Sequence, residues 1–201
     1  MINIFIAEDQ VILRDALTSL LDMENDIEVI GTAGSGKAVL DFSKLHDVDL
    51  LLMDIEMPDG TGLETAAALQ QQGFEGKIAL LTTFSRAGYI EKAMTIGVNG
   101  YLLKDEPIEE LIKAIRRIIN GKKAISPMLG DLLFNLKSNP LSEREQDIMR
   151  RVQQGKSTEQ IAREAHLTLG TVRNYVSSAM QKLETTNRYE AVQLAEEKGW
   201  L

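Results

Sequence analysis

The sequence contains no cysteine and only two histidines. The absence of cysteine excludes disulfide bonds, thiolate zinc sites and a cysteine nucleophile. Because two histidines are few for zinc or triad chemistry, any bound metal must be held by oxygen. No apolar run reaches 18 residues, and no basic segment precedes the apolar residues 2–7. We therefore expect a cytoplasmic protein that does not insert into a membrane.

The composition is that of an ordinary globular protein. Its 201 residues are 44% hydrophobic and 26% charged, and the length suits two modest domains. Residues 1–137 hold 13 Lys and Arg against 21 Asp and Glu, which accounts for the whole net charge of −8, whereas residues 138–201 hold nine of each kind. Because an acidic body repels polyanions, we expect any contact with nucleic acid to come from the C-terminal piece.

Short apolar runs alternate with amphipathic helical stretches over the first 120 residues. Five runs are expected as strands, at residues 2–7, 28–33, 49–53, 78–83 and 100–103. Apolar residues recur at helical spacing between and after them, notably in the stretches 13–21 and 108–119. This alternation predicts an α/β fold, with a doubly wound, five-stranded parallel sheet and helices on both faces. Ligands bind at the carboxyl ends of the strands in such sheets.

The last third is helical. Four short helices are expected, at residues 142–154, 157–165, 168–183 and 188–198, the first two opening with capping boxes. A helix-turn-helix pattern results from the second helix, the tight turn after it and the longer third helix. We predict domains at residues 1–120 and 139–201, joined by a linker at 121–138 that is partly helical near 128–136.

Five chemistry-bearing side chains follow the expected strands. Glu8 and Asp9 follow the first strand, Asp54 the third, Thr82 the fourth and Lys104 the fifth. All five should meet at one edge of the sheet, where three carboxylates need a hard cation such as Mg²⁺ between them. Lys104 and Thr82 could hold phosphoryl oxygens, and a central carboxylate could accept the phosphoryl group. Asp54 is the best candidate for that acceptor.

This constellation resembles the receiver domain of two-component response regulators. The resemblance rests on Glu8 and Asp9, residues 53–58 (MDIEMP), Thr82 and residues 101–105 (YLLKD). It implies a flavodoxin-like fold with Asp54 as the phosphoacceptor. It also implies that Mg²⁺ is held by Asp9, Asp54 and the backbone carbonyl of Glu56, with Glu8 acting through water. Thr82 and Tyr101 would form the switch pair.

The C-terminal piece resembles the LuxR-type DNA-binding domain of the NarL/FixJ regulators, through residues 140–145, 161–162, 170–175 and 182–183. The resemblance implies that Arg173, Asn174 and Ser177 read bases and that Thr171 and Lys182 contact phosphates. Residues 7–10, 81–84, 87–89, 170–175 and 198–200 look like the DesR-like subgroup, which is linked to membrane-lipid control.

We therefore expect a transcriptional regulator rather than an enzyme. It would accept a phosphoryl group on Asp54 from a sensor histidine kinase, itself membrane-bound, then form a homodimer and bind promoter DNA. Two alternatives stay open. One is a small P-loop NTPase, because residues 31–37 match the P-loop pattern G-x-x-x-x-G-K. Ala38 departs from this pattern, since a hydroxyl side chain should follow the lysine. The other is a DNA-binding regulator that works without phosphorylation.

Overall fold

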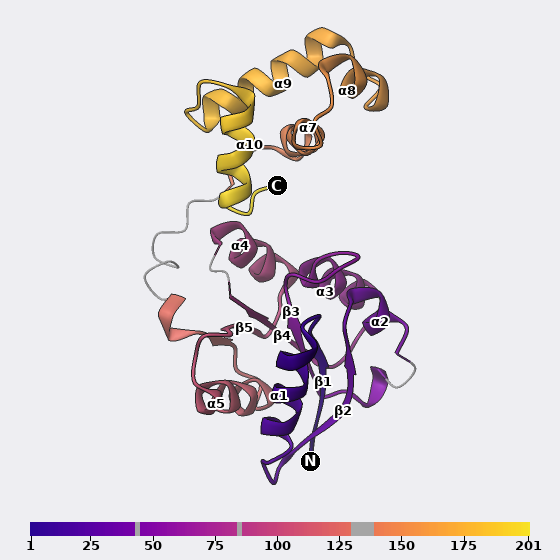
Figure 1. Ribbon diagram of the computed structural model, residues 1–201, viewed down its shortest axis with the longest axis vertical. Coiled ribbons are helices and arrows are strands. Elements are labelled where there is room, and N and C mark those ends of the chain that lie inside the picture. The colour runs from indigo at the N-terminus through magenta and orange to yellow at the C-terminus, as the bar shows by residue number, and fades with distance from the viewer. Residues whose placement is uncertain (43–44, 84–85, 130–138) are drawn as a thin grey trace. The chain divides into compact units, whose positions relative to one another are not determined.

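The computed structural model describes residues 1–42, 45–83, 86–129 and 139–201 (Figure 1). Its contacts divide the chain into two compact units, which we treat separately. The first comprises residues 1–85 and 92–134, and the second comprises residues 86–91 and 135–201. The expected helix near residues 128–136 falls largely outside the described residues, although a 3-10 turn, η2, spans Pro127–Leu129.

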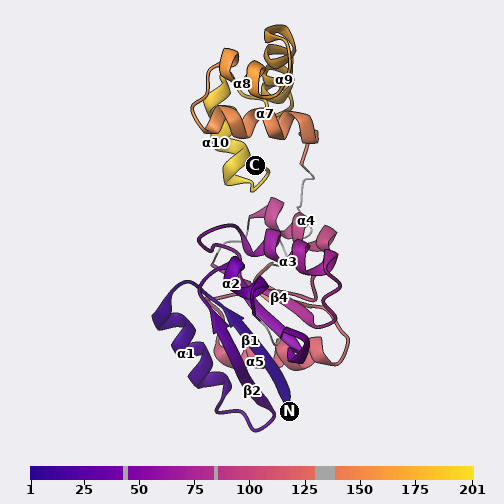
Figure 2. The ribbon, with the colours of Figure 1, turned by 90° about the vertical axis from the view of Figure 1, so that its right-hand side faces the viewer.

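A parallel sheet forms the centre of the first unit (Figure 2). Its strands stand in the order β2-β1-β3-β4-β5-β6. Their bounds are β1 Ile2–Ala7, β2 Ile27–Ala33, β3 Leu50–Asp54, β4 Lys77–Thr82, β5 Gly100–Leu103 and β6 Ala124–Ile125. The five expected strands are confirmed, but the prediction of five strands in all is wrong. β6 has only two residues, too few to show an apolar period, and it adds to the edge by pairing with β5.

Helices cover both faces of this sheet (Figure 1). They are α1 Val11–Leu21, α2 Gly36–Leu40, α3 Gly62–Gln71 and α5 Ile108–Ile119, with a 3-10 turn, η1, at Leu45–Asp47. The contacts divide α4, Ala87–Ile96, between the two units after residue 91. Side chains of α1 and α5 share one core with alternate residues of the strands. In α1 only Leu17 and Leu21 are buried, whereas Ala16 and Leu20 of the same apolar stripe are exposed. The stripe is thus wider than the part of the helix that faces the sheet.

The P-loop pattern at residues 31–37 does not form a phosphate-binding loop. Gly31 lies inside β2, where it pairs with Phe5 of β1, and the strand continues to Ala33. A Cβ at Gly31 would stand 2.8 Å from a ring carbon of Phe5. The glycine therefore permits a close approach between a strand and an aromatic ring, and the P-loop interpretation is not supported.

Residues 139–201 form four helices, as expected. They are α7 Glu143–Gln153, α8 Thr158–Glu164, α9 Leu169–Lys182 and α10 Arg188–Glu197. Both predicted capping boxes are confirmed, one at Ser142 with Glu145 and one at Ser157 with Gln160. The helices enclose a single apolar cluster that includes Trp200, the one tryptophan of the chain.

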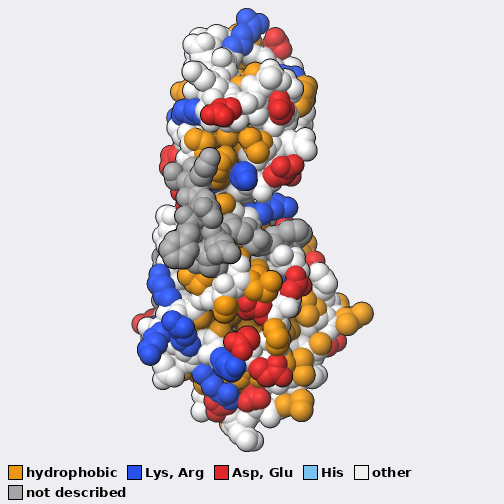
Figure 3. All heavy atoms as spheres, turned by 90° about the vertical axis from the view of Figure 1, so that its left-hand side faces the viewer, with side chains coloured by type: hydrophobic (Ala, Val, Ile, Leu, Met, Phe, Trp, Pro, Cys, Tyr) orange, Lys and Arg blue, Asp and Glu red, His pale blue; other side chains and the backbone are white. Residues whose placement is uncertain are grey.

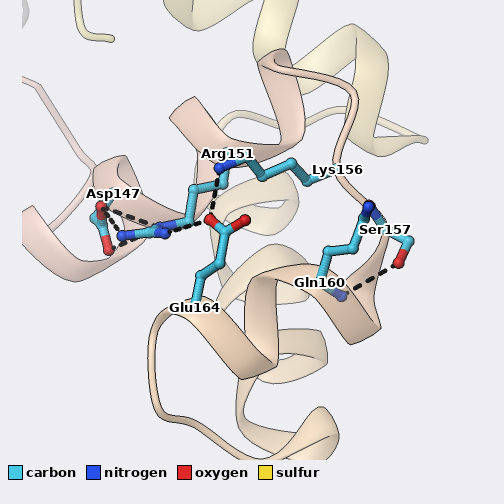
Figure 4. Close-up of polar contacts among 6 residues, drawn as sticks. All are labelled: Asp147, Arg151, Lys156, Ser157, Gln160 and Glu164. Atoms are coloured by element: carbon cyan, nitrogen blue, oxygen red, sulfur yellow. Dashed lines mark hydrogen bonds and ion pairs between the residues drawn. The ribbon is translucent and has the colours of Figure 1, made fainter.

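An ion-pair network joins α7 to α8 (Figure 4). The Arg151 guanidinium contacts Asp147 one turn earlier on α7 and lies 3.0 Å from Glu164 on α8. Lys156, in the turn between the helices, lies 2.5 Å from the same Glu164 carboxylate. Because most of these side chains are partly exposed, the network should add little to the stability of the unit.

The surface carries both signs of charge close together. Figure 3 shows Lys and Arg side chains beside Asp and Glu side chains on the lower part of the face that it displays. In α5 the two signs lie at opposite ends of the helix. Glu109 and Glu110 are in its first turn and Arg116 and Arg117 in its last, which suits the helix dipole. Among the described residues, no helix combines the length and the apolar character that crossing a membrane requires.

Candidate functional site

Three carboxylates meet at the carboxyl edge of the sheet, as the sequence predicts. Glu8 and Asp9 follow β1, and Asp54 ends β3, which pairs with β1. One ligand oxygen from each of the three lies within 4.8 Å of the others. Glu8 and Asp54 are buried, whereas Asp9 is exposed, so the cluster opens to solvent on one side. Carboxylate oxygens are the donors that Mg²⁺ prefers, and the cluster fits such an ion.

Lys104 lies among these carboxylates. Its ammonium nitrogen is 2.7 Å from Glu8 Oε2 and 2.9 Å from Asp54 Oδ2, and its side chain is only 6% exposed. Burial alone would lower the pKa of Lys104, but the hydrogen bonds and charges of Glu8 and Asp54 raise it overall. Burial raises the pKa of Glu8, and the Lys104 ammonium counters only part of that effect. The cation is therefore fixed where it can meet an anion bound beside Asp54.

The other residues implied by the resemblance lie on β4, on β5 and just after β3. Thr82 ends β4 next to Asp54, because β3 and β4 pair side by side, and it is fully buried. Tyr101 of β5 is also buried, at 3% exposure. Both residues that the resemblance implies as a switch pair are therefore buried in this structure. The backbone N–H of Glu56 donates to Asp54 Oδ1 over 3.3 Å, which restrains the carboxylate of Asp54.

The first helix of the helix-turn-helix, α8, ends at a tight turn, and α9 follows it. His166 occupies that turn with a φ of 55°, the left-handed conformation that stops a helix. Thr168 caps α9 by accepting a hydrogen bond from the backbone N–H of Thr171. Val172 and Ala179 bury one side of α9 in the core. Arg173, Asn174 and Ser177 are all exposed, so the structure presents the three expected base-reading side chains to solvent.

Lys182 is exposed to solvent over 39% of its side chain, and it also forms an ion pair within its own unit. Its ammonium lies 2.7 Å from Oε2 of Glu145, a buried residue of α7. Ser178, one turn earlier on α9, donates to the other oxygen of that carboxylate over 2.6 Å. The sequence predicts Glu145 only as part of a capping box and gives Ser178 no role. The available signal was the spacing of four between Ser178 and Lys182, which places both on one side of a helix.

Comparisons with known protein families match both parts of the chain. Residues 4–116 match the response regulator receiver domain, and residues 139–195 match the LuxR family of bacterial regulatory proteins. The chain is 50% identical to the transcriptional regulatory protein DesR of Bacillus subtilis (strain 168), with 100% of this chain and 99% of that protein covered. It is 31% identical to the nitrate/nitrite response regulator protein NarL of Escherichia coli (strain K12), with coverage of 94% and 92%.

Solved structures show the same architecture. The structure of the response regulator ChrA of a heme-sensing two-component system aligns with this chain at a TM-score of 0.60 and 29% identity. The alignment covers 100% of this chain and 98% of that one. RcsB of Salmonella enterica serovar Typhimurium, bound to a promoter, has a TM-score of 0.72 over 98% of both chains, and at 22% identity it supports the fold alone. With both domains matched in order along nearly the full length, the chain belongs to the NarL/FixJ response regulators, transcriptional regulators that join a receiver domain to a LuxR-type DNA-binding domain.

Proposed function

We propose that Asp54 accepts the phosphoryl group in this regulator. The observation that carries the proposal is the contact of one buried ammonium, that of Lys104, with both Glu8 and Asp54, beside the solvent-facing Asp9. An Asp54 carboxylate oxygen attacks the phosphorus of a phosphohistidine on the kinase. The new P–O bond replaces the P–N bond, and the histidine leaves with the electron pair. Asp54 is consumed once per transfer, so the chain is a switch and not an enzyme.

The neighbouring side chains can bind the negative charge that phosphorylation of Asp54 adds. The acyl phosphate brings about 1.5 to 2 negative charges to a site that already holds Glu8 and Asp9. Lys104 lies within ion-pair distance of the acceptor, and Thr82 ends the strand that pairs with the strand of Asp54. We therefore assign both side chains to the phosphoryl oxygens. We assign Thr82 and Tyr101 as the pair that senses the modification.

We propose that the acidic cluster holds Mg²⁺. Glu8, Asp9 and Asp54 supply oxygen atoms that lie close together. We assign Asp9, Asp54 and the backbone carbonyl of Glu56 as direct ligands, with Glu8 acting through water. Such an ion would neutralise the charge that gathers between the carboxylates and the incoming phosphoryl group. Because Asp9 is the exposed member of the cluster, its side is where the kinase phosphohistidine can approach.

The second unit would carry the output. We assign Arg173, Asn174 and Ser177 to base edges in the major groove and Thr171 to a phosphate, with the N-terminal half of α9 entering the groove. The Lys182 ammonium is paired with Glu145 although its side chain is 39% exposed, so we do not assign Lys182 to a phosphate. We propose residues 1–120 and 139–201 as the two domains and residues 121–138 as the linker, which also adds the two residues of β6 to the edge of the sheet.

The partners follow from this assignment. They are a membrane-bound sensor histidine kinase, promoter DNA, and a second copy of the chain once Asp54 is phosphorylated. The symmetric half-sites that dimeric helix-turn-helix proteins read match a two-fold dimer. We place the protein in the cytoplasm, where the DNA and the kinase's phosphohistidine would both be accessible.

Mass spectrometry of the intact protein tests the phosphoacceptor. After incubation with acetyl phosphate and Mg²⁺, we expect one added phosphoryl group that is lost in alkali and maps to Asp54. The Asp54→Asn variant keeps the shape of the side chain but lacks the nucleophile, and it should stay unlabelled. A stable phosphate ester, or equal labelling of the variant, would remove Asp54 from this role. A fully folded protein that takes no label would favour the regulator that works without phosphorylation.

A further inference from the structure

The buried carboxylate of Glu145 accepts several hydrogen bonds that the phosphoryl chemistry does not use. Its Oε2 atom accepts from the backbone N–H of Ser142 over 2.6 Å and from the Ser142 hydroxyl over 2.8 Å. The same atom contacts the Lys182 ammonium at 2.7 Å, while Oε1 accepts from the Ser178 hydroxyl at 2.6 Å. Both oxygens are therefore satisfied, and two of the four donors come from α9.

The electrostatics match this geometry. Burial by itself would raise the pKa of Glu145, but the hydrogen bonds from Lys182, Ser178 and Ser142 outweigh it and lower the pKa to about 2. Glu145 is only 3% exposed, so its carboxylate is an anion kept inside the unit by donors on two helices. A capping box needs only the Ser142 contacts, and the contacts with α9 are additional to it.

Those contacts fix how α9 is turned about its own axis. Ser178 and Lys182 are four residues apart, so they lie on one side of the helix and hold it at two successive turns. Ser177 is the preceding residue and lies about 100° around the helix from Ser178. Asn174 lies one turn before Ser178. Arg173 lies about 8 Å before Ser178 along the helix axis. A rotation of α9 that released Glu145 would therefore redirect all three of these exposed side chains.

We propose that Glu145 is a positioning residue for DNA recognition: its buried carboxylate clamps α9 through Ser178 and Lys182 and so sets the angle at which Arg173, Asn174 and Ser177 meet the bases. The proposal rests on DNA binding by the second unit and adds a residue of α7 that touches no DNA. Lys182 acts here as part of the clamp. Specific binding needs base-reading side chains in register, whereas non-specific binding to phosphates tolerates a shift. Loss of the clamp should therefore lower specificity more than overall affinity.

Binding of the full-length chain to two duplexes tests this role. One duplex is selected from a random-sequence library by the unsubstituted protein, and the other is the same sequence shuffled. Selection of a sequence demonstrates specific DNA binding before any Glu145 variant is made. Glu145→Gln keeps the capping box but removes the charge. We expect it to weaken binding to the selected duplex about tenfold and to the shuffled duplex less than twofold. Trp200 fluorescence confirms that each variant is folded during the titration.

Two more variants separate the clamp from a direct phosphate contact. If Lys182 acts through the clamp, Lys182→Met lowers discrimination, which is the ratio of the affinities for the selected and the shuffled duplex, as Glu145→Gln does. It then leaves the salt dependence of binding unchanged, and the double variant shows no further loss. If Lys182 instead touches phosphate, Lys182→Met weakens both duplexes equally and lowers the log-log salt slope by about one. In that case Glu145→Gln, which releases the ammonium, strengthens both. Either of these results overturns the proposal.

A matched control breaks a different ion pair between helices in the same unit. Glu164→Gln removes the contacts of α8 with Arg151 and Lys156 but leaves the α7–α9 contacts in place, and we expect unchanged discrimination. Equal loss of discrimination in Glu164→Gln and Glu145→Gln would mean that general loosening, and not positioning, is responsible. Ser178→Ala removes one clamp hydrogen bond without changing any charge and should lower discrimination in the same direction. Should Glu145→Gln fail to fold, unchanged discrimination in Ser178→Ala would overturn the proposal by itself.

Discussion

Lys104 separates two buried carboxylates, and its removal should be costly. The ammonium contacts Glu8 and Asp54, and all three side chains are at most 6% exposed. Lys104→Met would leave two buried anions facing each other without a cation, so we expect the free energy of unfolding to fall by about 3 kcal/mol. Urea unfolding followed by circular dichroism, with EDTA present to exclude divalent ions, measures this change.

Asp54→Asn provides the opposite case at the same site. It removes one of three clustered carboxylates while Lys104 keeps its contact with Glu8, so we expect an equal or slightly higher unfolding midpoint. Lys113→Met is the matched lysine control, because its side chain is 69% exposed and its loss should change stability by less than about 0.5 kcal/mol. A Lys104→Met variant as stable as the Lys113→Met variant would contradict the interpretation of this site.

The turn between α8 and α9 contains a backbone strain that a single substitution can relieve. His166 has a φ of 55°, where a side chain clashes with the backbone and glycine does not. We expect His166→Gly to raise the stability of the second unit by about 0.5 to 1 kcal/mol, as measured by urea unfolding followed through Trp200 fluorescence. Gly155 ends α7 with a φ of 76°, and Gly155→Ala should lower stability by about 1 kcal/mol. A His166→Gly variant less stable than the unsubstituted protein would show that the imidazole contributes more than its strain costs.

Among the elements, the contact between α7 and α9 should depend on pH through Glu145. The hydrogen bonds from Lys182, Ser178 and Ser142 offset burial and lower its pKa from 4.5 to about 2 in the folded state. Its stabilisation is therefore complete above pH 5 and is lost as the pH falls toward 2, because the unfolded chain takes up the proton first. Between pH 6 and pH 3 we expect a loss of about 2 kcal/mol from this group.

Trp200 fluorescence in urea at the two pH values measures that loss, since this tryptophan is buried in the second unit. Other carboxylates of the unit also titrate in this range, so the relevant quantity is the difference between the unsubstituted protein and Glu145→Gln. The variant should lose about 2 kcal/mol less than the unsubstituted protein. Identical slopes in both would mean that Glu145 is not held as a buried anion.

Strand ends were predictable from the sequence, while contacts between distant elements were not. An apolar run followed by Asp54, Thr82 or Lys104 marks both a strand and its carboxyl edge, and parallel connections bring those ends together. The two-residue β6 has no period to detect and exists only because it pairs with β5. Similarly, the partner of Lys182 is 37 residues away on α7. No local pattern distinguishes a clamped lysine from a solvated one.

For the molecule as a whole, phosphorylation should change the oligomeric state. The added charge lies beside Lys104 and Thr82, at the end of strands on which loops of the first unit converge, and it can reorder those loops. We expect a shift from monomer toward dimer when acetyl phosphate and Mg²⁺ are added. Sedimentation velocity at micromolar concentrations detects it, with Asp54→Asn as the control. Superimposable profiles of the two forms of the unsubstituted protein would contradict a phosphorylation-driven dimer.

The central claim is that a phosphoryl group on Asp54 controls DNA binding by the other unit. The most direct measurement is the affinity of the full-length chain for its selected duplex, with and without acetyl phosphate and Mg²⁺, in the unsubstituted protein and in Asp54→Asn. We predict that the phosphodonor tightens binding at least tenfold in the unsubstituted protein and has no effect on Asp54→Asn. Equal affinities with and without the phosphodonor, in a sample that mass spectrometry shows to be phosphorylated, would contradict that claim.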